Sequence, residues 1–288
     1  MPQITLPQGT VHYRSTGDGP PVVLLHGYLM GSRLWEPVAD RLASDFRCIS
    51  PDLPLGAHRI PLSPDTELDL VGIARLVADL LDALDLREVT LVGNDYGTAI
   101  AQTVAARHPE RIGRLVLTSG ECFDNSPATW FKPLVPAARV PGLLTFAFQS
   151  LRSRTLRRLP FAYGLLTAND LPHDLIDDWV DAFFSDRGVR RDCEKVTRGF
   201  RPAATLDTAN RIASFDRPAL IAFGREDRHF PFEHGARLAA LLPDARLAAV
   251  PDTRTWVMLD QTEMISDLIG EFIRSTPIGA ARSDDAPV

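Results

Sequence analysis

The stretch LVGNDYGTAI, residues 91–100, decides how this chain is interpreted. An apolar run from Val89 to Val92 ends in a turn with glycine at both ends, and small and apolar residues at helical spacing follow. This order predicts a buried strand, a tight turn and a helix, the geometry of a nucleophile elbow, in which the turn holds one side chain above a sheet. The central residue is Asp95, where the familiar form of this turn carries Ser. The sequence therefore predicts a carboxylate at the reactive position of an elbow.

Strand-like and helix-like segments alternate on both sides of this elbow. Continuous apolar runs predict buried strands at residues 21–27, 46–53 and 112–120. Leu and Val at helical spacing predict a helix over residues 67–86, and a second helix is expected over residues 97–109. Such alternation is typical of an α/β fold with a mostly parallel sheet and helices on both faces.

The alternation stops between residues 123 and 215, where Pro, Arg and aromatic residues are frequent and the helical patterns are short. The strand signal returns at residues 218–227, so we interpret the middle as an insertion between two halves of one sheet. The predicted organisation has four parts: a first part of the core (1–122), a helical cap (123–215), a second part of the core (216–276) and a disordered tail (277–288).

Composition excludes several classes of function. The chain has 288 residues, 45% of them hydrophobic, and a formal net charge of −6, which argues against a nucleic-acid or anionic-membrane partner. The sequence has no signal peptide pattern and no apolar run of the roughly 18 residues that a membrane helix needs. The three cysteines are widely spaced, so we expect no disulfide framework and no metal site. We expect a cytoplasmic monomer or homodimer that acts on a small molecule.

The elbow, the alternation and the insertion together resemble an α/β-hydrolase with a cap domain, over roughly residues 10–274. His26 and Gly27 match the oxyanion turn of that family, and the stretch FGREDRHFP, residues 223–231, matches its acid loop. An Asp at the elbow resembles haloalkane dehalogenases, fluoroacetate dehalogenases and epoxide hydrolases. The resemblance implies that Asp95 is a nucleophile.

The chemistry of Asp95 follows from its residue type. A carboxylate with a reference pKa near 4 is already charged at neutral pH and can attack a saturated carbon. The backbone N–H groups of Tyr28 and Tyr96, at the oxyanion turn and at the start of the helix, would then stabilise an oxyanion. The alternative interpretation is that Asp95 only caps the helix, a role that Asp favours. The two flanking glycines and the upstream His26–Gly27 pair favour the functional interpretation.

The histidine that normally activates water is missing. The resemblance places it in the loop VPDTRTWVMLDQTE, residues 250–263, where this chain has Thr255. A threonine hydroxyl is no base near neutral pH. His58 and His229 are expected on the same side of the sheet and are the possible replacements. A loop histidine bonded to backbone or water is the more common arrangement, so we expect neither to act.

Two acids are candidates for the catalytic set. The resemblance implies that Asp227 is the acid of the family's acid loop, and that Glu121 lies near the alternative position used by some dehalogenases. Each can equally be a loop cap or a solvated charge. Carboxylates that crowd an apolar pocket raise one another's pKa, which would make Asp95 a proton carrier.

The remaining candidates would bind substrate. Tyr96 follows the reactive position directly, where haloalkane dehalogenases use a Trp to hold the halide. Aromatic side chains of the cap can donate hydrogen bonds or form the pocket wall. The candidate substrate-binding residues are His26, Trp130, Tyr163, Trp179, Thr255 and Trp256.

The sequence therefore predicts an α/β-hydrolase-fold enzyme with Asp95 as reactive carboxylate, acting on a small to medium apolar substrate without a metal or an organic cofactor. The first alternative is a lyase, isomerase or cyclase in which Asp95 is a general acid or base. The missing histidine favours that alternative. The second alternative is a pseudoenzyme or ligand-binding protein.

Overall fold

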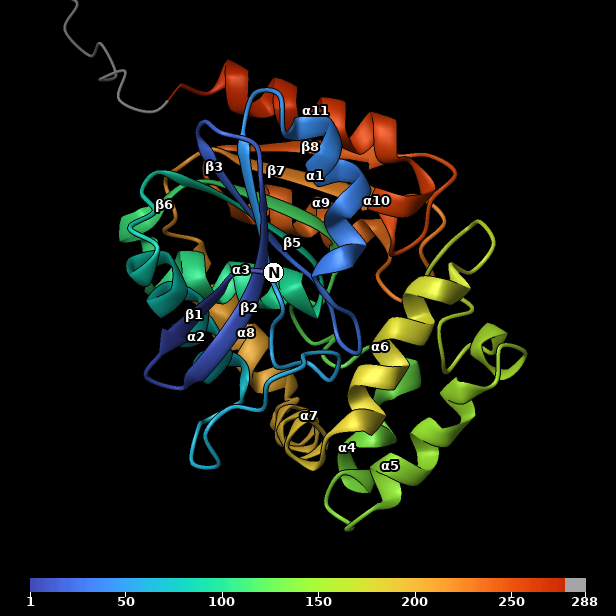
Figure 1. Cartoon of the computed structure of the whole chain (residues 1–288). Coiled ribbons are helices and arrows are strands. Elements are labelled where there is room, and N and C mark those ends of the chain that lie inside the picture. Colours follow the sequence, from blue (N-terminus) through green and yellow to red (C-terminus); the bar gives the residue numbers. More distant parts are fainter. Residues whose placement is uncertain (278–288) are drawn as a thin grey trace, which may run out of the picture.

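The computed structural model describes residues 1–277, and within them eight strands form one sheet in the order β1-β2-β4-β3-β5-β6-β7-β8 (Figure 1). Strand β2 runs antiparallel to β1 and to β4, and all other neighbours are parallel. The predicted mostly parallel sheet is confirmed. The strands are β1 Gln3–Leu6, β2 Gly9–Thr16, β3 Pro21–Leu25, β4 Arg47–Pro51, β5 Val89–Asp95, β6 Ile112–Gly120, β7 Ala219–Gly224 and β8 Ala245–Val250.

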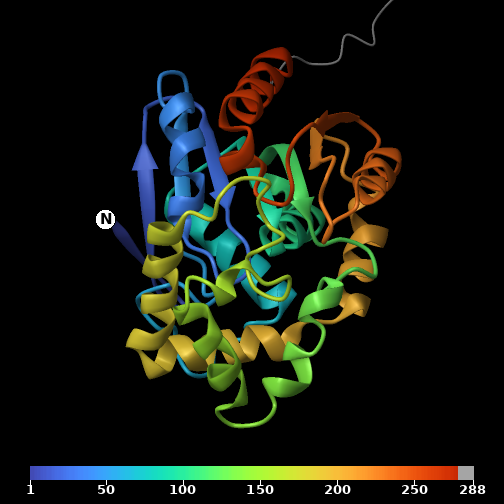
Figure 2. The same cartoon turned by 90° about the vertical axis from the view of Figure 1, so that its right-hand side faces the viewer.

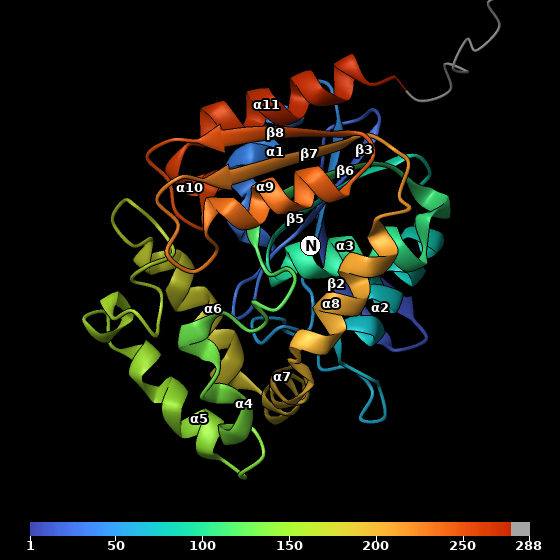
Figure 3. The same ribbon diagram turned by 180° about the vertical axis from the view of Figure 1, so that it is seen from behind.

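Helices cover both faces of the sheet. Helices α1 and α11 lie on the face nearest the viewer in Figure 1, and α2, α3, α8 and α9 lie on the face nearest the viewer in Figure 3. The core helices are α1 Glu36–Leu42, α2 Leu70–Ala83, α3 Tyr96–Arg107, α8 Pro202–Ile212, α9 Phe232–Leu241, α10 Val257–Asp260 and α11 Thr262–Ser275. No helix within residues 1–277 combines the length and the apolar character that crossing a bilayer requires.

Strands β5 and β6 lie in the interior of the sheet. Every residue of β5 and β6 is buried, as expected for strands covered on both faces. The first ten residues of α3, from Tyr96 to Ala105, are also buried, and many are Ala, Gly or Thr, so this helix packs close to the sheet. Helix α2 begins after Asp69, whose carboxylate accepts a hydrogen bond from the backbone N–H of Gly72 at 3.0 Å.

The insertion between β6 and α8 folds into short helices that gather at one end of the molecule (Figure 2). These are η3 Thr129–Phe131, α4 Leu134–Ala137, α5 Leu143–Phe148, η4 Gln149–Arg152, η5 Leu156–Arg158, α6 His173–Ser185 and α7 Arg187–Gly199; two further 3₁₀ helices of the core are η1 Ser32–Trp35 and η2 Pro109–Arg111. The helices of the insertion lie beyond the carboxyl ends of β5 and β6.

Helix α8 is part of the sequence assigned to the cap, yet it packs on the core. The hydroxyls of Thr208 and Thr103 of α3 lie 3.0 Å apart, and Arg107 Nη2 donates to Asp207 Oδ2 at 2.6 Å. The cap boundaries at residues 123 and 215 therefore stay a prediction. Of the predicted tail, residues 278–288 lie outside the described part of the chain.

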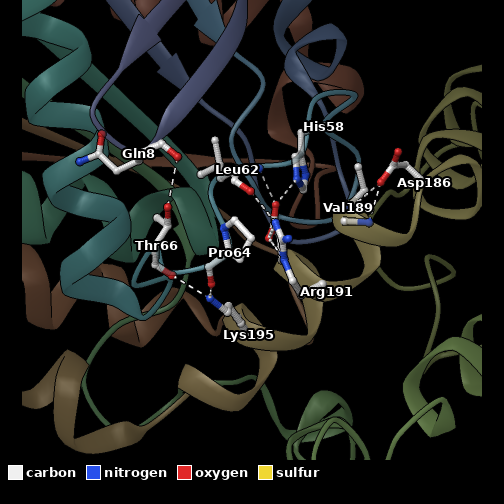
Figure 4. Close-up of polar contacts among 11 residues, drawn as sticks. Gln8, His58, Leu62, Pro64, Thr66, Asp186, Val189, Arg191 and Lys195 are labelled. Carbon is white, nitrogen blue, oxygen red and sulfur yellow. Dashed lines mark hydrogen bonds and ion pairs between the residues drawn. The ribbon is translucent and has the colours of Figure 1, made fainter.

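Helix α7 fastens the cap to the loop between β4 and α2 (Figure 4). Asp192 Oδ2 accepts the backbone N–H of Leu62 at 2.8 Å and lies 3.3 Å from His58 Nε2, and Arg191 donates to the carbonyl of Leu62. One turn further on, Lys195 Nζ donates to the carbonyl oxygen of Thr66 at 3.1 Å. Charged side chains of one cap helix thus bind backbone groups of a core loop.

Candidate active site

Asp95 lies at the carboxyl end of β5, at the first turn of α3, in a backbone conformation that L-residues rarely adopt. Its φ is 56° and its ψ is −124°. The flanking glycines permit the turn, because a Cβ on Gly93 would lie 2.4 Å from the carbonyl oxygen of Gly97, and a Cβ on Gly97 would lie 2.5 Å from that of Leu25. The turn therefore has the strained geometry of an elbow, with the Asp95 side chain directed away from the sheet.

One oxygen of the Asp95 carboxylate accepts hydrogen bonds from two backbone N–H groups. Oδ1 accepts the N–H of Tyr28 at 2.9 Å and the N–H of Tyr96 at 2.7 Å. Within the described residues, Oδ2 accepts no hydrogen bond that meets the usual geometric limits. Gly27 makes this arrangement possible, since a Cβ there would lie 2.2 Å from Asp95 Oδ1. The two N–H groups thus hold one oxygen and leave the other for a ligand.

A cavity of about 530 Å³ lies above the elbow and beneath the cap. Asp95 and Glu121 are the acidic residues among its lining, and within the described chain that lining contains no Lys, Arg or His. The remaining walls are mainly apolar side chains from the cap. They are Leu29, Met30, Pro127, Phe131, Pro133, Leu134, Ala147, Phe148, Leu151, Phe161, Ala162, Leu166 and Phe200, together with Tyr28, Trp130, Ser150 and Tyr163.

Both acids of the cavity are weaker acids than usual. Burial raises the pKa of Asp95 to about 6, although the two backbone N–H groups oppose the rise. Burial and then the neighbouring Asp95 charge raise the pKa of Glu121 well above its ordinary value. Glu121 lies beside the elbow, because its backbone N–H donates to the carbonyl oxygen of Asp95 at 3.1 Å. The pair therefore joins Asp95, whose pKa is about 6, to a neighbouring carboxyl group that holds its proton more tightly than an ordinary Glu.

Asp227 lies in the loop after β7, is buried, and does not line the cavity. Its Oδ1 accepts the backbone N–H groups of His229 and Phe230 at 2.8 and 2.9 Å, and burial raises its pKa to about 7. The hydroxyls of Thr255 and Ser119 lie near this carboxyl group. Within residues 1–277, however, Asp227 Oδ2 and Thr255 Oγ1 both lack a hydrogen-bond partner of acceptable geometry. Asp227 therefore lies outside the lining of the cavity, and its role as the acid stays a prediction.

Neither replacement histidine reaches the cavity. His58 is on the outer side of the loop after β4, against Asp192. His229 is buried, and both of its ring nitrogens lack a partner within the described residues. Burial, and then the nearby Arg254, lower its pKa to about 4, so it is neutral at pH 7. It packs on Phe131, whose ring centre is 5.5 Å away, and does not line the cavity.

Two of the predicted aromatic residues line the cavity. Trp130 is half exposed and Tyr163 is buried. The hydroxyl of Tyr163 donates to the carbonyl oxygen of Leu29 at 2.9 Å, so it is not free for a ligand. The sequence indicated a role only for the backbone N–H of Tyr28, but its side chain also lines the cavity. The Tyr28 hydroxyl lies 2.5 Å from Thr197 Oγ1 of α7.

The other predicted binding residues face elsewhere. Trp179 lines a separate hollow beside Arg33, and Trp256 donates its indole N–H to Met30 Sδ at 3.3 Å. The Tyr96 ring packs on Phe200 at 4.6 Å, and its hydroxyl has no partner within the described residues. These three side chains do not line the cavity above Asp95, and a ligand contact for them stays a prediction.

His26 and Thr255 also do not line the cavity. Both ring nitrogens of His26 are used: Nδ1 lies 2.9 Å from the carbonyl oxygen of Gly27, and Nε2 accepts the N–H of Leu53 at 2.9 Å. Burial lowers the pKa of His26, which keeps the ring neutral. The ring thereby shapes the oxyanion turn and does not touch a ligand.

The cap side chains that form most of the cavity wall were not predicted from the sequence. Phe148, Leu151 and Phe200 line the cavity from three different segments of the insertion. Apolar residues were visible at those positions, but nothing in their spacing distinguishes pocket wall from cap core.

The fold and the elbow define a class of protein, and a family comparison agrees. The family model described as alpha/beta hydrolase fold matches residues 20–262, and the chain belongs to that family.

The relatives of known name are hydrolases. The chain is 26% identical to 2-hydroxy-6-oxo-6-phenylhexa-2,4-dienoate hydrolase of Burkholderia cepacia, over 91% of each protein. It is 29% identical to 2-hydroxy-6-oxononadienedioate/2-hydroxy-6-oxononatrienedioate hydrolase 2 of Pseudomonas putida, over 92% of this chain and 91% of the relative. Among solved structures, an ancestral haloalkane dehalogenase superposes with a TM-score of 0.78 at 22% identity, covering 96% of this chain and 99% of that one. At this identity the structural likeness concerns the fold.

Proposed function

We propose that the chain is a hydrolase-type enzyme in which the Asp95 carboxylate attacks a saturated carbon of a small, uncharged, apolar substrate. The observation that carries the proposal is the state of the carboxylate. Oδ1 is held by two backbone N–H groups, and the side chain lies in an apolar cavity from which a ligand can approach Oδ2. A pKa of about 6 leaves Asp95 mostly charged at pH 7.

The first step needs no histidine. Asp95 Oδ2 forms a bond to carbon while the bond from that carbon to its leaving group breaks, and the leaving group departs with the electron pair. For a haloalkane the leaving group is halide. For an epoxide the breaking bond is carbon to oxygen, and the carboxyl group of Glu121 beside Asp95, whose pKa is raised by burial, is the group that would supply the proton that the alkoxide takes up.

The second step lacks a component. In the alkyl ester, Oδ1 is the carbonyl oxygen, and the N–H groups of Tyr28 and Tyr96 already surround the place where an oxyanion would form. A water must still be deprotonated, and within the described residues the cavity lining contains no histidine. General-base help is typically worth about 10² to 10⁴-fold, so the ester should accumulate.

The cavity also constrains the charge of the substrate. The named relatives act on dienoates, which carry a carboxylate. Here the described lining offers two carboxyl groups and no cation, so an anionic substrate would be repelled and left without a partner. We therefore propose a neutral substrate for this chain.

The test is intact-protein mass spectrometry after incubation with matched electrophiles. Primary bromoalkanes and terminal epoxides should add their mass to the protein, and peptide mapping should place the adduct on Asp95. The same carbon chains ending in a carboxylate should label far less. Asp95→Asn should abolish labelling, whereas Asp124→Asn, at an exposed acid near the cap, should not. No labelling by any neutral electrophile, or labelling that survives Asp95→Asn, would overturn the proposal.

A second candidate is proton transfer by the same pair of acids. The observation that favours it is the position of Glu121, which lines the same cavity as Asp95 and whose pKa is raised by burial and by the Asp95 charge, because two carboxyl groups in one apolar site can act as an acid and a base. Conversion of a substrate that requires both carboxyl groups and leaves no adduct on Asp95 would support this lyase- or isomerase-type function.

A further inference from the structure

Charge is unevenly distributed along the chain. Residues 125–169, here called the basic cap segment, contain six cationic side chains and no Asp or Glu, whereas the whole chain has a net charge of −6. The six are Lys132, Arg139, Arg152, Arg154, Arg157 and Arg158. Arg154 and Arg157 pair with acids of α6. Within residues 1–277, the other four have no carboxylate within ion-pair distance, and all four are exposed.

The same segment exposes apolar side chains. Of the ten large hydrophobic residues that are exposed within the described chain, six belong to it: Trp130, Val140, Leu143, Phe146, Leu156 and Phe161. Phe146 of α5 is 74% exposed, the highest value among them. Helices α4 and α5 lie on the outer side of the cap, away from the sheet (Figures 1 and 3). Bulky apolar groups among unpaired cations are unusual on a surface that faces only water.

The segment also forms the entrance of the cavity. Trp130 and Phe161 line the cavity and are 50% and 49% exposed, so each touches both the interior and the solvent. Ala147, the neighbour of Phe146, lines the cavity from the inside. A surface bound to this segment would therefore lie directly at the mouth of an apolar chamber.

We propose that the basic cap segment docks on the surface of an anionic lipid bilayer, with its exposed aromatic side chains in the headgroup region. The proposal departs from the expectation based on the net charge of −6, because the positive charge is concentrated in this one segment. Cations attracted to anionic lipid, combined with Trp, Phe and Leu that insert shallowly, are the two components of interfacial binding. The acidic remainder of the chain is repelled by the same surface, which sets the orientation with the cavity mouth toward the lipid. An apolar substrate dissolved in the bilayer would then enter without crossing water.

Charge decides between a lipid and a second copy of the chain. A two-fold dimer through this segment would bring its four exposed cations without an ion-pair partner among the described residues, Lys132, Arg139, Arg152 and Arg158, close to an identical set. Like charges that face one another at an interface cost several kcal/mol. An anionic bilayer has the complementary sign.

The test is vesicle flotation at low ionic strength, without substrate. The protein should float with vesicles of phosphatidylcholine mixed with phosphatidylglycerol and not with phosphatidylcholine alone, and added salt should release it. The triple variant Lys132→Gln, Arg139→Gln, Arg158→Gln should weaken binding by about a hundredfold, since each cation near the surface contributes about fivefold. The matched control Arg41→Gln, Arg87→Gln, Arg246→Gln removes the same charge from exposed positions on the core and should not weaken it.

The apolar contribution has its own pair of variants. Phe146→Ser should weaken binding by about tenfold, and Leu206→Ser, at a residue of α8 that is 42% exposed, should leave it unchanged. Asp95→Asn should bind vesicles like the wild type, because docking does not depend on the proposed chemistry. Absence of binding to the anionic vesicles, equal losses in the two triple variants, or concentration-dependent dimers that the cap variants abolish would each overturn the proposal.

Discussion

The elbow after β5 differs from the pair of loops after β7 and β8, which hold Asp227 and Thr255, in how the hydrogen bonds of its buried polar groups are satisfied. At the elbow, Oδ1 of Asp95 accepts two backbone N–H groups, and the cavity lies open above it. In the loop region, Asp227 Oδ2 and Thr255 Oγ1 lack partners within the described residues, and neither side chain lines the cavity. The elbow has two backbone N–H donors in place for a charge that develops on oxygen. The second region lacks the group that would use its acid.

The difference between the two regions separates two chemical steps. Attack by a carboxylate and stabilisation of an oxyanion need only the elbow. Activation of water needs a base oriented by an acid. Under the proposed function Asp227 would be that acid, but Thr255 cannot take a proton, so we expect the two steps to be uncoupled in this chain.

The largest effect should come from supplying the missing base. Thr255→His places an imidazole beside the unpartnered Oδ2 of Asp227, which can accept its N–H and orient the ring. We expect the adduct on Asp95 to decay about 10² to 10⁴-fold faster, measured by intact mass over time. Thr255→Asn is the control, because its side chain cannot act as a base. Equal decay in both variants would contradict the interpretation of the loop.

The next effect concerns stability and compares the two aspartates. Burial raises the pKa of Asp227 from 3.8 to about 7, which corresponds to about 4 kcal/mol of destabilisation when the group is charged. Asp227→Asn should therefore increase the free energy of unfolding by up to about 4 kcal/mol above pH 7, while labelling of Asp95 persists. For Asp95→Asn the rise from 3.8 to about 6 predicts up to about 3 kcal/mol, with labelling lost.

The pH dependence of these gains has a definite sign. A carboxyl group whose pKa is higher in the folded state binds its proton more tightly there, so folding is favoured at low pH. The wild type should lose stability from Asp227 between about pH 4 and pH 7, and the Asp227→Asn variant should not. Urea denaturation at a series of pH values measures this. A gain that persists unchanged below pH 4 would show that its origin is not the buried charge.

A smaller effect should follow from disturbing the elbow sterically. Gly27→Ala would place a methyl group 2.2 Å from Asp95 Oδ1, so the carboxylate must leave its two N–H donors. We expect a loss of about 1–3 kcal/mol in unfolding free energy and a large loss of labelling rate. Gly31→Ala is the matched control in the same loop, since its nearest neighbour would be 3.2 Å away and its φ is −132°.

The smallest effect should come from the unpartnered hydroxyl. Thr255→Val keeps the shape of the side chain and removes a buried oxygen that has no partner within the described residues. We expect stability to rise by about 1 kcal/mol, read from the denaturation midpoint, with labelling unchanged. A clear loss of stability would mean that Thr255 Oγ1 bonds to Asp227, and the contrast between the two regions would then weaken.

The elbow was predictable because it depends on short-range rules. Asp95 and the N–H group of Tyr96 lie at the carboxyl end of β5 because a buried strand, a glycine-flanked turn and a helix follow one another. Strand β3 pairs with β5, which brings Tyr28 to the same end of the sheet. The same rule indicated the loop that holds Thr255. The roles of these residues remain a prediction, although their positions follow from the fold.

The walls of the cavity were not predictable in the same way. Trp179 was expected to bind substrate as an aromatic residue of the cap, but α6 places it outside the cavity lining, buried next to Gly31. Phe200, at the end of α7, instead packs on Tyr96 and lines the cavity. Tertiary packing decides which aromatic side chains of a cap helix face the cavity, and periodicity alone does not determine it.

The fastening of α7 to the core loop has a consequence for motion. Arg191, Asp192 and Lys195 tie that helix to backbone groups of the loop after β4, whereas α4 and α5 are only four and six residues long. Isolated helices of that length are unstable on their own. Backbone amides of α4 and α5 should therefore exchange their hydrogens with solvent sooner than those of α7. Motion of the roof would then be greatest at α4 and α5, while α7 stays in place as its fixed border.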